Sequence, residues 1–497
     1  MPRKDKEWLI QNIKNLRAEI LWDDFVWVLT KHFGFKLINK PGSLPCPDSA
    51  AKCSTGYVTL KKNWTKYTIK LTGNLSKITG GFGWVTNASQ NGNKDIKFFL
   101  DKIQYNKSRL EEKRFLVSFK NECINTDGFD VIHRNVAFTY DNAMALLVFL
   151  ATSQSDRAKL LADALIYAQK NDRWYNDGRL RNAYQAGDLI SPPCWTPNGK
   201  VGTVRMPGYH LTKCADDGEK ECYPDCGTWC ESPEHVGISA GNMAWAMLAL
   251  LRFYELKGKS LPNGQDYKNA AIAMGEWVEM HCRSNSGGYT WGYLQWEPNP
   301  EKQLYKSTEH NIDLYAAFMG LYKLTNEAKW LERAHYAKAF VAAMWQPEGY
   351  FWAGTDKEDN PNTLIPLDCI PWAILAFTGA DRKKYLSGLD YAEAHHKVGC
   401  GYAFSNFDTS GIWYEGTGQM AVAYKTAGDL SKYQDILNCL HAAQNANGGL
   451  PAASKDRLDT GIPGWLYYKR LHVGATAWLI LAEKMRNPFQ PRMPVIP

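Results

Sequence analysis

Six segments of the chain share one pattern, in which a polar turn is followed at once by apolar residues at helical spacing. In the first, residues 139–142 read Thr-Tyr-Asp-Asn and residues 143–150 read Ala-Met-Ala-Leu-Leu-Val-Phe-Leu. The other five turns lie near residues 240, 307, 366, 414 and 471. Helices that are apolar on most faces are buried, and their N-termini leave backbone donors free. We therefore expect six inner helices whose starts meet in one polar pit.

A second, more amphipathic segment follows most of these stripes. The second segments span residues 157–169, 267–280, 329–344, 384–395 and 433–444. Their outward positions carry Lys, Asp, Glu and Gln, which is typical of an outer layer of helices. The alternation predicts a mainly α protein built on an (α/α)6 toroid. Residues 7–33 also have helical spacing and are assigned as the sixth outer helix.

The N-terminal part of the chain has a different character. Residues 57–60, 66–71 and 96–103 alternate or run apolar like strands, and glycine- and asparagine-containing turns separate them. These features predict a small β-sandwich of jelly-roll type. The expected organisation is an N-terminal helix at 1–34, a β-sandwich at 35–108, a linker at 109–134, the toroid at 135–488 and a tail at 489–497.

Composition and charge narrow the range of partners. The chain of 497 residues has a net charge of +7 without a long basic run, so nucleic-acid binding is not expected. No stretch of 18 apolar residues occurs, so no membrane span is expected. The chain contains 19 Trp, 26 Tyr and 19 Phe, and such side chains suit sugar binding because a pyranose ring has an apolar face. A polysaccharide or oligosaccharide is the expected partner.

Twelve cysteines bear on the cellular compartment. Four of them crowd a polar segment: Cys214, Cys222, Cys226 and Cys230. Their spacing lacks the Cys-x2-Cys knuckles of common zinc folds, which favours disulfides over a metal site. Cys46 and Cys53 are expected to close a short loop, whereas Cys282, Cys369, Cys400 and Cys439 read as core thiols. The charged start at residues 1–6 is not followed by the apolar stretch of a signal peptide. The number of cysteines nevertheless favours an extracellular or periplasmic protein. No metal and no cofactor are expected.

Acidic residues at the helix starts suggest a reaction. Glycoside hydrolysis needs one protonated carboxyl group and one ionised carboxylate around the same bond. Glu309, Glu415 and Asp141 are the catalytic candidates. Capping of a helix would equally account for Asp141, Glu415 or Asp368. It does not account for Glu309, because the capping-box partner of Ser307 would be residue 310.

Further residues near the helix starts are candidates for substrate binding. Residues 171–238 form a long loop rich in Gly, Pro and aromatic residues, as a cleft wall would be. Gly and Pro also flank the two tryptophans at 291 and 296, which favours a loop that presents them to a sugar. The substrate-binding candidates are Asp313, His310, Asp368, Arg179, Arg181, Tyr184, Trp291, Trp296, Trp413 and His472.

Several motifs support a resemblance to known families. The toroid segment is similar to (α/α)6-barrel glycoside hydrolases and their bacterial relatives, without assignment to one family. The motifs that carry this likeness are Tyr140-Asp141-Asn142-Ala143, Gly178 to Tyr184, Ser307 to Asp313, Tyr414-Glu415-Gly416-Thr417 and His472 to Thr476. Residues 63–105 resemble the last strands of a carbohydrate-binding jelly roll. The resemblance implies a glycosidase that acts with inversion.

Two other functions stay open. A polysaccharide lyase would use His310, His472 or Tyr184 as the base, with Arg179 and Arg181 to neutralise a uronate. A non-catalytic surface or matrix protein would bind glycans with a degenerate toroid. Formation of an ultraviolet-absorbing unsaturated end would select the lyase, and an effect that survives loss of both Glu309 and Glu415 would select the binding protein.

Overall fold

The computed structural model describes residues 113–120, 128–191, 197–209 and 230–490. These residues belong to two units, one made of 113–189 and 204–497 and the other of 1–112 and 190–203. In the second unit the described part contains a short 3-10 turn, Pro197–Gly199. The predicted N-terminal helix and β-sandwich, residues 1–108, lie outside the described residues. The larger unit carries every element discussed below.

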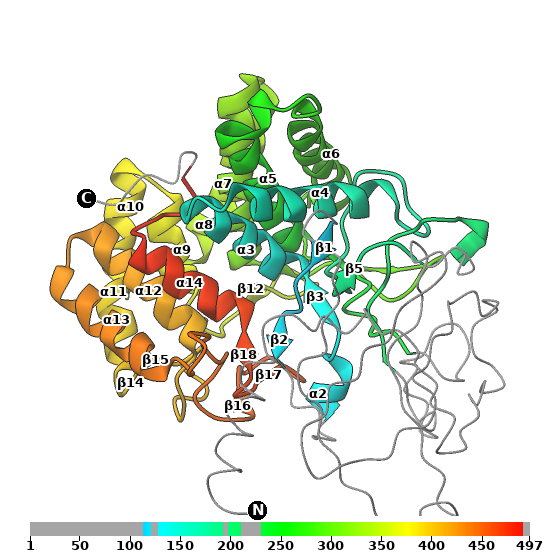
Figure 1. Ribbon diagram of the computed structural model, residues 1–497. Helices are drawn as coiled ribbons and strands as arrows, with labels where there is room; N and C mark the ends of the chain where they lie inside the picture. The colour runs from blue at the N-terminus through cyan, green and yellow to red at the C-terminus, as the bar shows by residue number, and fades with distance from the viewer. Residues whose placement is uncertain (1–112, 121–127, 192–196, 210–229, 491–497) are drawn as a thin grey trace, which may run out of the picture. The chain divides into compact units, whose positions relative to one another are not determined.

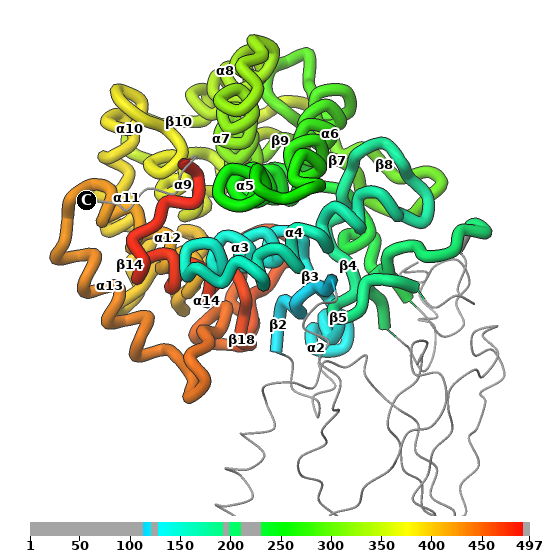
Figure 2. Tube along the Cα trace, turned by 45° about the horizontal axis from the view of Figure 1, so that its top comes forward, coloured from blue at the N-terminus to red at the C-terminus, as the bar shows by residue number. Residues whose placement is uncertain are grey.

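Six inner helices form a closed ring, as predicted. They are α3 (Thr139–Ala151), α5 (Ala240–Leu256), α7 (Thr308–Thr325), α9 (Cys369–Ala376), α12 (Tyr414–Ala427) and α14 (Val473–Glu483). Each helix packs against the next, and α14 packs against α3 to close the ring (Figure 2). Most of their side chains are buried, because each helix has neighbours on both sides and an outer layer behind it.

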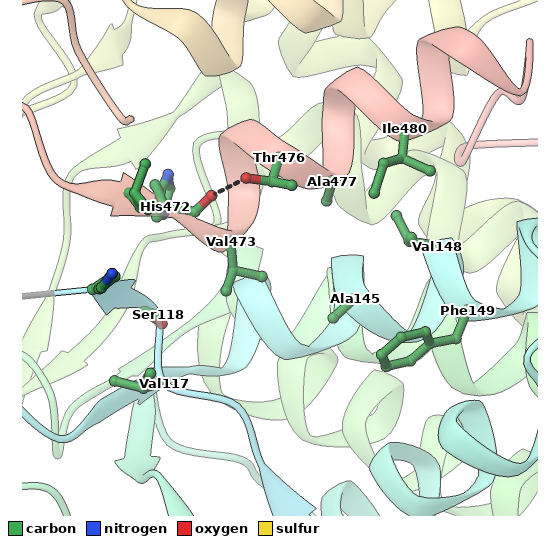
Figure 3. Close-up of a pocket in the computed structure, with 12 residues that line it drawn as sticks. Val117, Ser118, Ala145, Val148, Phe149, His472, Val473, Thr476, Ala477 and Ile480 are labelled. Atoms are coloured by element: carbon green, nitrogen blue, oxygen red, sulfur yellow. Dashed lines mark hydrogen bonds between the residues drawn. The ribbon is translucent and has the colours of Figure 1, made fainter. Parts of the chain in front are cut away.

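The outer layer is made of α4 (Ser155–Lys170), α6 (Gln265–Cys282), α8 (Ala328–Met344), α10 (Gly379–Tyr385), α11 (Gly388–His395) and α13 (Leu430–Ala443). Each of these packs on the inner helix that precedes it, and α10 and α11 both cover α9 (Figure 1). Between α3 and α14 an apolar cavity of about 270 Å³ opens, lined by Ala145, Val148, Val473, Ala477 and Ile480 among others (Figure 3). No helix in the described ranges is both long and apolar enough to cross a membrane.

Short antiparallel strands connect the helices. The pairs are β1 (Arg114–Phe115) with β5 (Gly187–Asp188), β2 (Phe119–Lys120) with β18 (Leu471–His472), β3 (Val136–Phe138) with β4 (Ala183–Gln185), β10 (Trp345–Gln346) with β11 (Tyr350–Phe351), β14 (Lys397–Val398) with β15 (Gly401–Tyr402), and β16 (Leu458–Asp459) with β17 (Leu466–Tyr467). Two sheets have three strands, in the orders β6 (Ile238–Ser239), β7 (Gly292–Leu294), β8 (Glu301–Gln303) and β13 (Pro361–Asn362), β12 (Gly354–Thr355), β9 (Lys306–Ser307). The short helices α2 (Gly128–Ile132) and η6 (Gly258–Ser260) complete the described elements.

Two of these strand regions differ from the sequence-based expectation. The segment 109–134 was expected to be a linker, yet β1, β2 and α2 belong to the same unit as the ring. The stretch 287–298 was expected to be a loop, yet its centre forms β7 of a three-stranded sheet. In both cases the strands are only two or three residues long, too short to give a visible alternation.

The fourth residue of four inner helices fixes the start of the helix. These residues are Asn142, Asn311, Thr417 and Thr476. In α3, Asn142 Oδ1 accepts from the backbone N–H of Leu116 at 2.8 Å while its Nδ2 donates to the carbonyl of the same residue at 3.1 Å. In α7, Asn311 Oδ1 accepts from the backbone N–H of Tyr289 at 2.9 Å, and its Nδ2 donates to the carbonyl of Tyr289 at 3.1 Å. The two threonines each accept one backbone N–H from a neighbouring loop, at 3.1 and 3.0 Å. We call these four the locking residues.

The cysteines also depart from the prediction. Cys400, between β14 and β15, forms a disulfide with Cys439 of α13, with 5.6 Å between their Cα atoms. The prediction of core thiols at these two positions was therefore wrong, whereas Cys282 and Cys369 are buried free thiols as expected. In the Cys214–Cys230 group, Cys230 is disulfide-bonded, and the other three lie outside the described residues together with Cys46 and Cys53.

Candidate active site

Carboxyl groups from four inner helices converge at one end of the ring. Asp141 lies in the first turn of α3, Glu309 in that of α7 and Glu415 in that of α12, while Asp368 immediately precedes α9 and Asp313 lies one turn into α7. The charges of Asp368 and Glu415 act on Glu309, and those of Asp141 and Asp368 act on Glu415. The structure thus brings together the acidic residues that the sequence singled out.

The surroundings of Glu309 and Asp313 favour the protonated form of both carboxyl groups. Burial raises the pKa of Glu309 well above its ordinary value, and the negative charges of Asp368 and Glu415 raise it further. Burial likewise raises the pKa of Asp313, followed by the charges of Glu309 and Asp368. Asp313 is fully buried, whereas Glu309 is only half-buried. Of these two protonated groups, Glu309 is therefore the one that a ligand in the pit can reach.

Glu415 has a different set of neighbours. Burial raises its pKa to about 7, against the lowering effects of His472 and of a hydrogen bond from Tyr140. The Tyr140 hydroxyl donates to Glu415 Oε1 and accepts a hydrogen bond from Trp478 Nε1 at 2.8 Å. His472 Nδ1 lies 3.5 Å from Glu415 Oε2, and His472 Nε2 lies 3.2 Å from Asp141 Oδ1. These contacts stabilise the ionised form of Glu415.

His472 is held between two carboxylates. Burial lowers its pKa, but the charge of Asp141, a hydrogen bond to it and the charge of Glu415 raise the pKa above its ordinary value overall. Nδ1 lies 3.4 Å from the backbone N of Ala475 and can accept its N–H to cap α14 while the ring is neutral, whereas in the protonated ring both nitrogens donate, toward Glu415 and Asp141. Gly474 leaves the room for this arrangement, because a Cβ there would lie 2.9 Å from Glu415 Oε2 and 3.0 Å from Asp141 Oδ1. The cluster therefore depends on a residue without a side chain.

His310 lies in the same region but is neutral. Burial lowers its pKa to about 4. Its ring is 6.0 Å from that of Trp291, and it packs so closely on Gly241 of α5 that a Cβ at that position would collide with it. Ser307 caps α7 by accepting from the His310 backbone N–H at 3.2 Å. Since Ser307 does the capping, the carboxyl group of Glu309 is left without a capping role.

Tyr467 was not selected from the sequence. Its phenol lies among the pit carboxyl groups: burial and the charges of Glu415, Asp368, Glu309 and Asp141 raise its pKa well above the ordinary value. The ring stacks on Trp413 at 5.5 Å between centroids. Trp413 was predicted to bind a sugar, but it is only 2% exposed, and its ring packs against that of Tyr467 instead. Tyr140 and Trp478 were missed as well, since neither stands out within its apolar helix.

Three candidates in the loop 171–238 are tied up in structural contacts. Arg181 is 1% exposed, and its Nε and Nη2 donate to Asp172 at 2.6 and 2.9 Å. The Tyr184 hydroxyl accepts from the Arg181 backbone N–H at 2.9 Å, and Arg179 pairs with Asp177 at 2.6 Å. We therefore remove these three residues from the site, because their polar groups hold the loop itself.

The two tryptophans predicted as sugar platforms have separate surroundings. Trp291 is half-buried beside His310, at the edge of the pit. Trp296 is also half-buried, but its indole N–H donates to the carbonyl of Glu231 at 3.1 Å, and its ring packs on the core. Trp291 is retained as a wall of the pit, whereas the contacts of Trp296 anchor the preceding loop. Within the described ranges, no three acidic, histidine or cysteine side chains are grouped as metal ligands.

Comparison with known proteins identifies the fold. The chain matches no known protein-family model and no curated protein sequence. Among solved structures, a sugar epimerase from a ruminal bacterium superposes with a TM-score of 0.51 at 12% identity, covering 75% of this chain and 93% of that one. Cellobiose 2-epimerase from Bacillus thermoamylovorans gives 0.50 at 11% identity with the same coverage. An alpha-amylase from Clostridium perfringens gives 0.48 at 11% identity, covering 76% and 93%. The epimerase superpositions show that the ring has the same (α/α)6 fold as these two proteins, and at this identity they show the fold alone.

Proposed function

We propose that this protein is a carbohydrate-active enzyme that hydrolyses a glycosidic bond in a polysaccharide or oligosaccharide. The observation that carries the proposal is the contrast between Glu309 and Glu415, which are both the second residue of an inner helix. Glu309 has neighbours that keep it protonated, whereas Tyr140 and His472 stabilise the ionised form of Glu415. Because burial still raises the pKa of Glu415 to about 7, the pair offers the protonated and the ionised carboxyl group that the reaction requires at and above neutral pH.

The roles follow from these protonation states. Glu309 donates its proton to the glycosidic oxygen as the bond to the anomeric carbon breaks. Glu415 takes a proton from the water that attacks that carbon, so that both carboxyl groups exchange states at the end of the step. Asp141 contacts His472 rather than the pit centre, and we assign it a positioning role. This scheme inverts the anomeric configuration, for which the two carboxyl groups must be about 6.5–9.5 Å apart.

Glu309→Gln tests the proposal. The variant should fold like the wild type, because Glu309 is half-buried and makes no capping bond, and it should lose turnover of a natural polysaccharide by about 10²–10⁴-fold. A glycosyl fluoride of the same sugar needs no proton on its leaving group, so its hydrolysis should survive. Glu301→Gln, at an exposed position of β8, is the matched control. Full turnover of the polysaccharide by Glu309→Gln would refute the assigned role.

Sugar epimerisation is a second candidate. His310 on α7 is neutral while the pKa of His472, which precedes α14, is raised, and these two helices lie on opposite sides of the ring. A neutral and a protonated imidazole could remove and return a proton beside a sugar carbonyl. The two solved structures of highest TM-score given above are epimerases, which supports testing this reaction. An isomerised sugar without chain shortening, seen by NMR, would select it over hydrolysis.

The remaining alternatives have less support. The lyase hypothesis relied on Arg179 and Arg181 as cations for a uronate, and both guanidinium groups are paired with aspartates of their own loop.

Export from the cytoplasm remains our proposal, and the Cys400–Cys439 disulfide supports it because such bonds persist in oxidising compartments. Mass spectrometry of the protein from its native source, without reduction, would show whether that bond is formed.

A further inference from the structure

The β16–β17 hairpin links the pit to its rim. Leu458 pairs with Tyr467 and Asp459 with Leu466. The Thr460 hydroxyl donates to the carbonyl of Trp465 at 2.8 Å, which places residue 465 opposite residue 460 and continues the hairpin by one step. Side chains two residues apart on an extended strand point to the same face, separated by about 6.6 Å. Trp465 immediately precedes β17 and lies two residues before Tyr467, and its backbone N–H donates to the carbonyl of Ile462 at 3.0 Å in the turn of the hairpin.

Exposed aromatic surface is concentrated beside this hairpin. Trp465 is 45% exposed and Phe407, on the loop before α12, is 66% exposed. They are two of the three exposed Trp and Phe side chains in the part of the chain that the structure describes. Gly461 of the hairpin packs on Phe407 and Leu364, since a Cβ there would lie 3.1 Å from Phe407 Cβ and 2.8 Å from Leu364 Cδ1. Leu364 precedes α9, Phe407 precedes α12 and Gly461 precedes α14, so loops before three inner helices meet at Gly461.

Hydrogen bonds between these loops fix the positions of the rings. Ser405 Oγ donates to the carbonyl of Thr460 at 2.9 Å, and Asp408 Oδ2 accepts from the backbone N–H of Asp459 at 3.1 Å. The Phe407 backbone N–H donates to Ser405 Oγ at 3.2 Å. A rigid aromatic surface binds a ligand with little loss of conformational freedom. The exposure of Trp465 and Phe407 is therefore not the result of an unfixed loop.

We infer that Trp465 and Phe407 form an outer subsite, which binds the next ring of a glycan whose first ring lies in the pit beside Tyr467. The inference rests on the proposed function and names its substrate class, an extended and electrically neutral glycan. Trp465 lies two residues before Tyr467 at the end of the same hairpin, so the two aromatic side chains are close enough along the chain to contact successive sugar rings. The apolar face of a pyranose lies flat on an indole. Asp368, with a pKa raised to about 6, and Glu415, with a pKa of about 7, are ionised above pH 7, so their negative charges repel an anionic glycan there.

Binding to the full chain that carries Glu309→Gln tests this subsite without turnover. The probes are neutral oligosaccharides of one to six rings, built from glucose, mannose, xylose or N-acetylglucosamine, with oligogalacturonates as the anionic comparison. Affinity is measured by calorimetry and by tryptophan fluorescence. Adding Trp465→Ala should weaken binding of chains of two or more rings about tenfold and leave binding of single rings unchanged. Trp465→Phe keeps a flat face and should retain most of the affinity.

A matched control separates the subsite from a general surface effect. Leu256, 44% exposed, ends α5 and lies at the opposite end of the ring from the helix starts, so Leu256→Ala should leave every affinity unchanged. Equal affinity of the Trp465→Ala and parent proteins for every chain length would overturn the inference, as would failure of the parent to bind any neutral probe. A change in sedimentation without a change in glycan affinity would also overturn it, in favour of a protein contact. Turnover by Glu309→Gln would instead count against the proposed function alone.

Discussion

Glu415→Gln is predicted to change how the stability of the protein depends on pH. Glu415 is 5% exposed, and its pKa is about 7 in the folded protein against an ordinary value of 4.5. Below pH 4.5 the group is protonated in both the folded and the unfolded state. Between pH 4.5 and 7 the unfolded chain releases the proton while the folded protein keeps it, so the free energy of unfolding falls as pH rises. Above pH 7 both states are ionised and the loss is constant.

The size of this effect follows from the pKa difference. A shift of about 2.5 pKa units corresponds to about 3 kcal/mol, because one unit is worth about 1.4 kcal/mol. Glutamine binds no proton, so the variant lacks this decline. Relative to the wild type, the variant should therefore gain about 3 kcal/mol of stability between pH 4.5 and pH 8. The sign is opposite to that of an ion-paired carboxylate, which stabilises the fold as it ionises.

Urea denaturation between pH 4.5 and 8, followed by circular dichroism, measures the difference. Glu393→Gln is the control. Burial would raise the pKa of Glu393, but hydrogen bonds from Tyr402 and Tyr424 and the charge of Lys397 hold it at about 2. Glu393 is ionised throughout this range in the folded protein, and the unfolded chain has finished releasing this proton about one pH unit above the ordinary value of 4.5. From there up to pH 8 this variant should differ from the wild type by a constant amount. A constant difference for Glu415→Gln would show that the folded protein does not retain the proton of Glu415.

Two further substitutions test other contacts. Tyr140→Phe removes the hydroxyl that donates to Glu415, so the rising limb of kcat/KM should move to higher pH by about one unit; it also leaves Trp478 Nε1 without its acceptor, which should cost about 1–3 kcal/mol of stability. An unmoved limb in a pH–rate profile would contradict this reading. Cys400→Ser opens the bond to Cys439, 39 residues away, and should lower the free energy of unfolding by about 4 kcal/mol. Reduction of the wild type should cost at least as much, because it also breaks the disulfide of Cys230. Equal stability of Cys400→Ser and the unreduced wild type would contradict this prediction.

The helices could be predicted because their signal is local. The segments 143–150 and 240–256 are apolar on most faces and are longer than a typical buried strand, so they identify buried helices without knowledge of the tertiary structure. The outer segment predicted at 384–395 covers the end of α10 and all of α11, because Leu386 and Ser387 between them do not break the apolar period. The strands were harder, since pairs such as β2 with β18 join residues more than 300 positions apart.

The site could be predicted only in part. Glu309 and Glu415 occupy polar turns before apolar helices, and that local contrast is visible in the sequence. The roles of Tyr140 and Tyr467 depend on how the ring closes, which no local pattern shows. From the sequence of a polar loop, an arginine that binds a ligand cannot be told from one that is buried in an ion pair. Arg181 is buried in an ion pair with Asp172. Cys439 lies within an amphipathic helix, which gave no sign of its distant partner.

At the starts of the inner helices, the second and the fourth residue have different roles. The second residue faces the pit, as Tyr140, Glu309 and Glu415 do, while the locking residue two places later ties the helix to the adjacent loop. Substitutions of the second residue should change the groups that face the pit. Substitutions of the locking residue should weaken the contact between the helix start and the adjacent loop. The groups that face the pit can therefore be exchanged while the contacts that hold the helix starts in place stay intact.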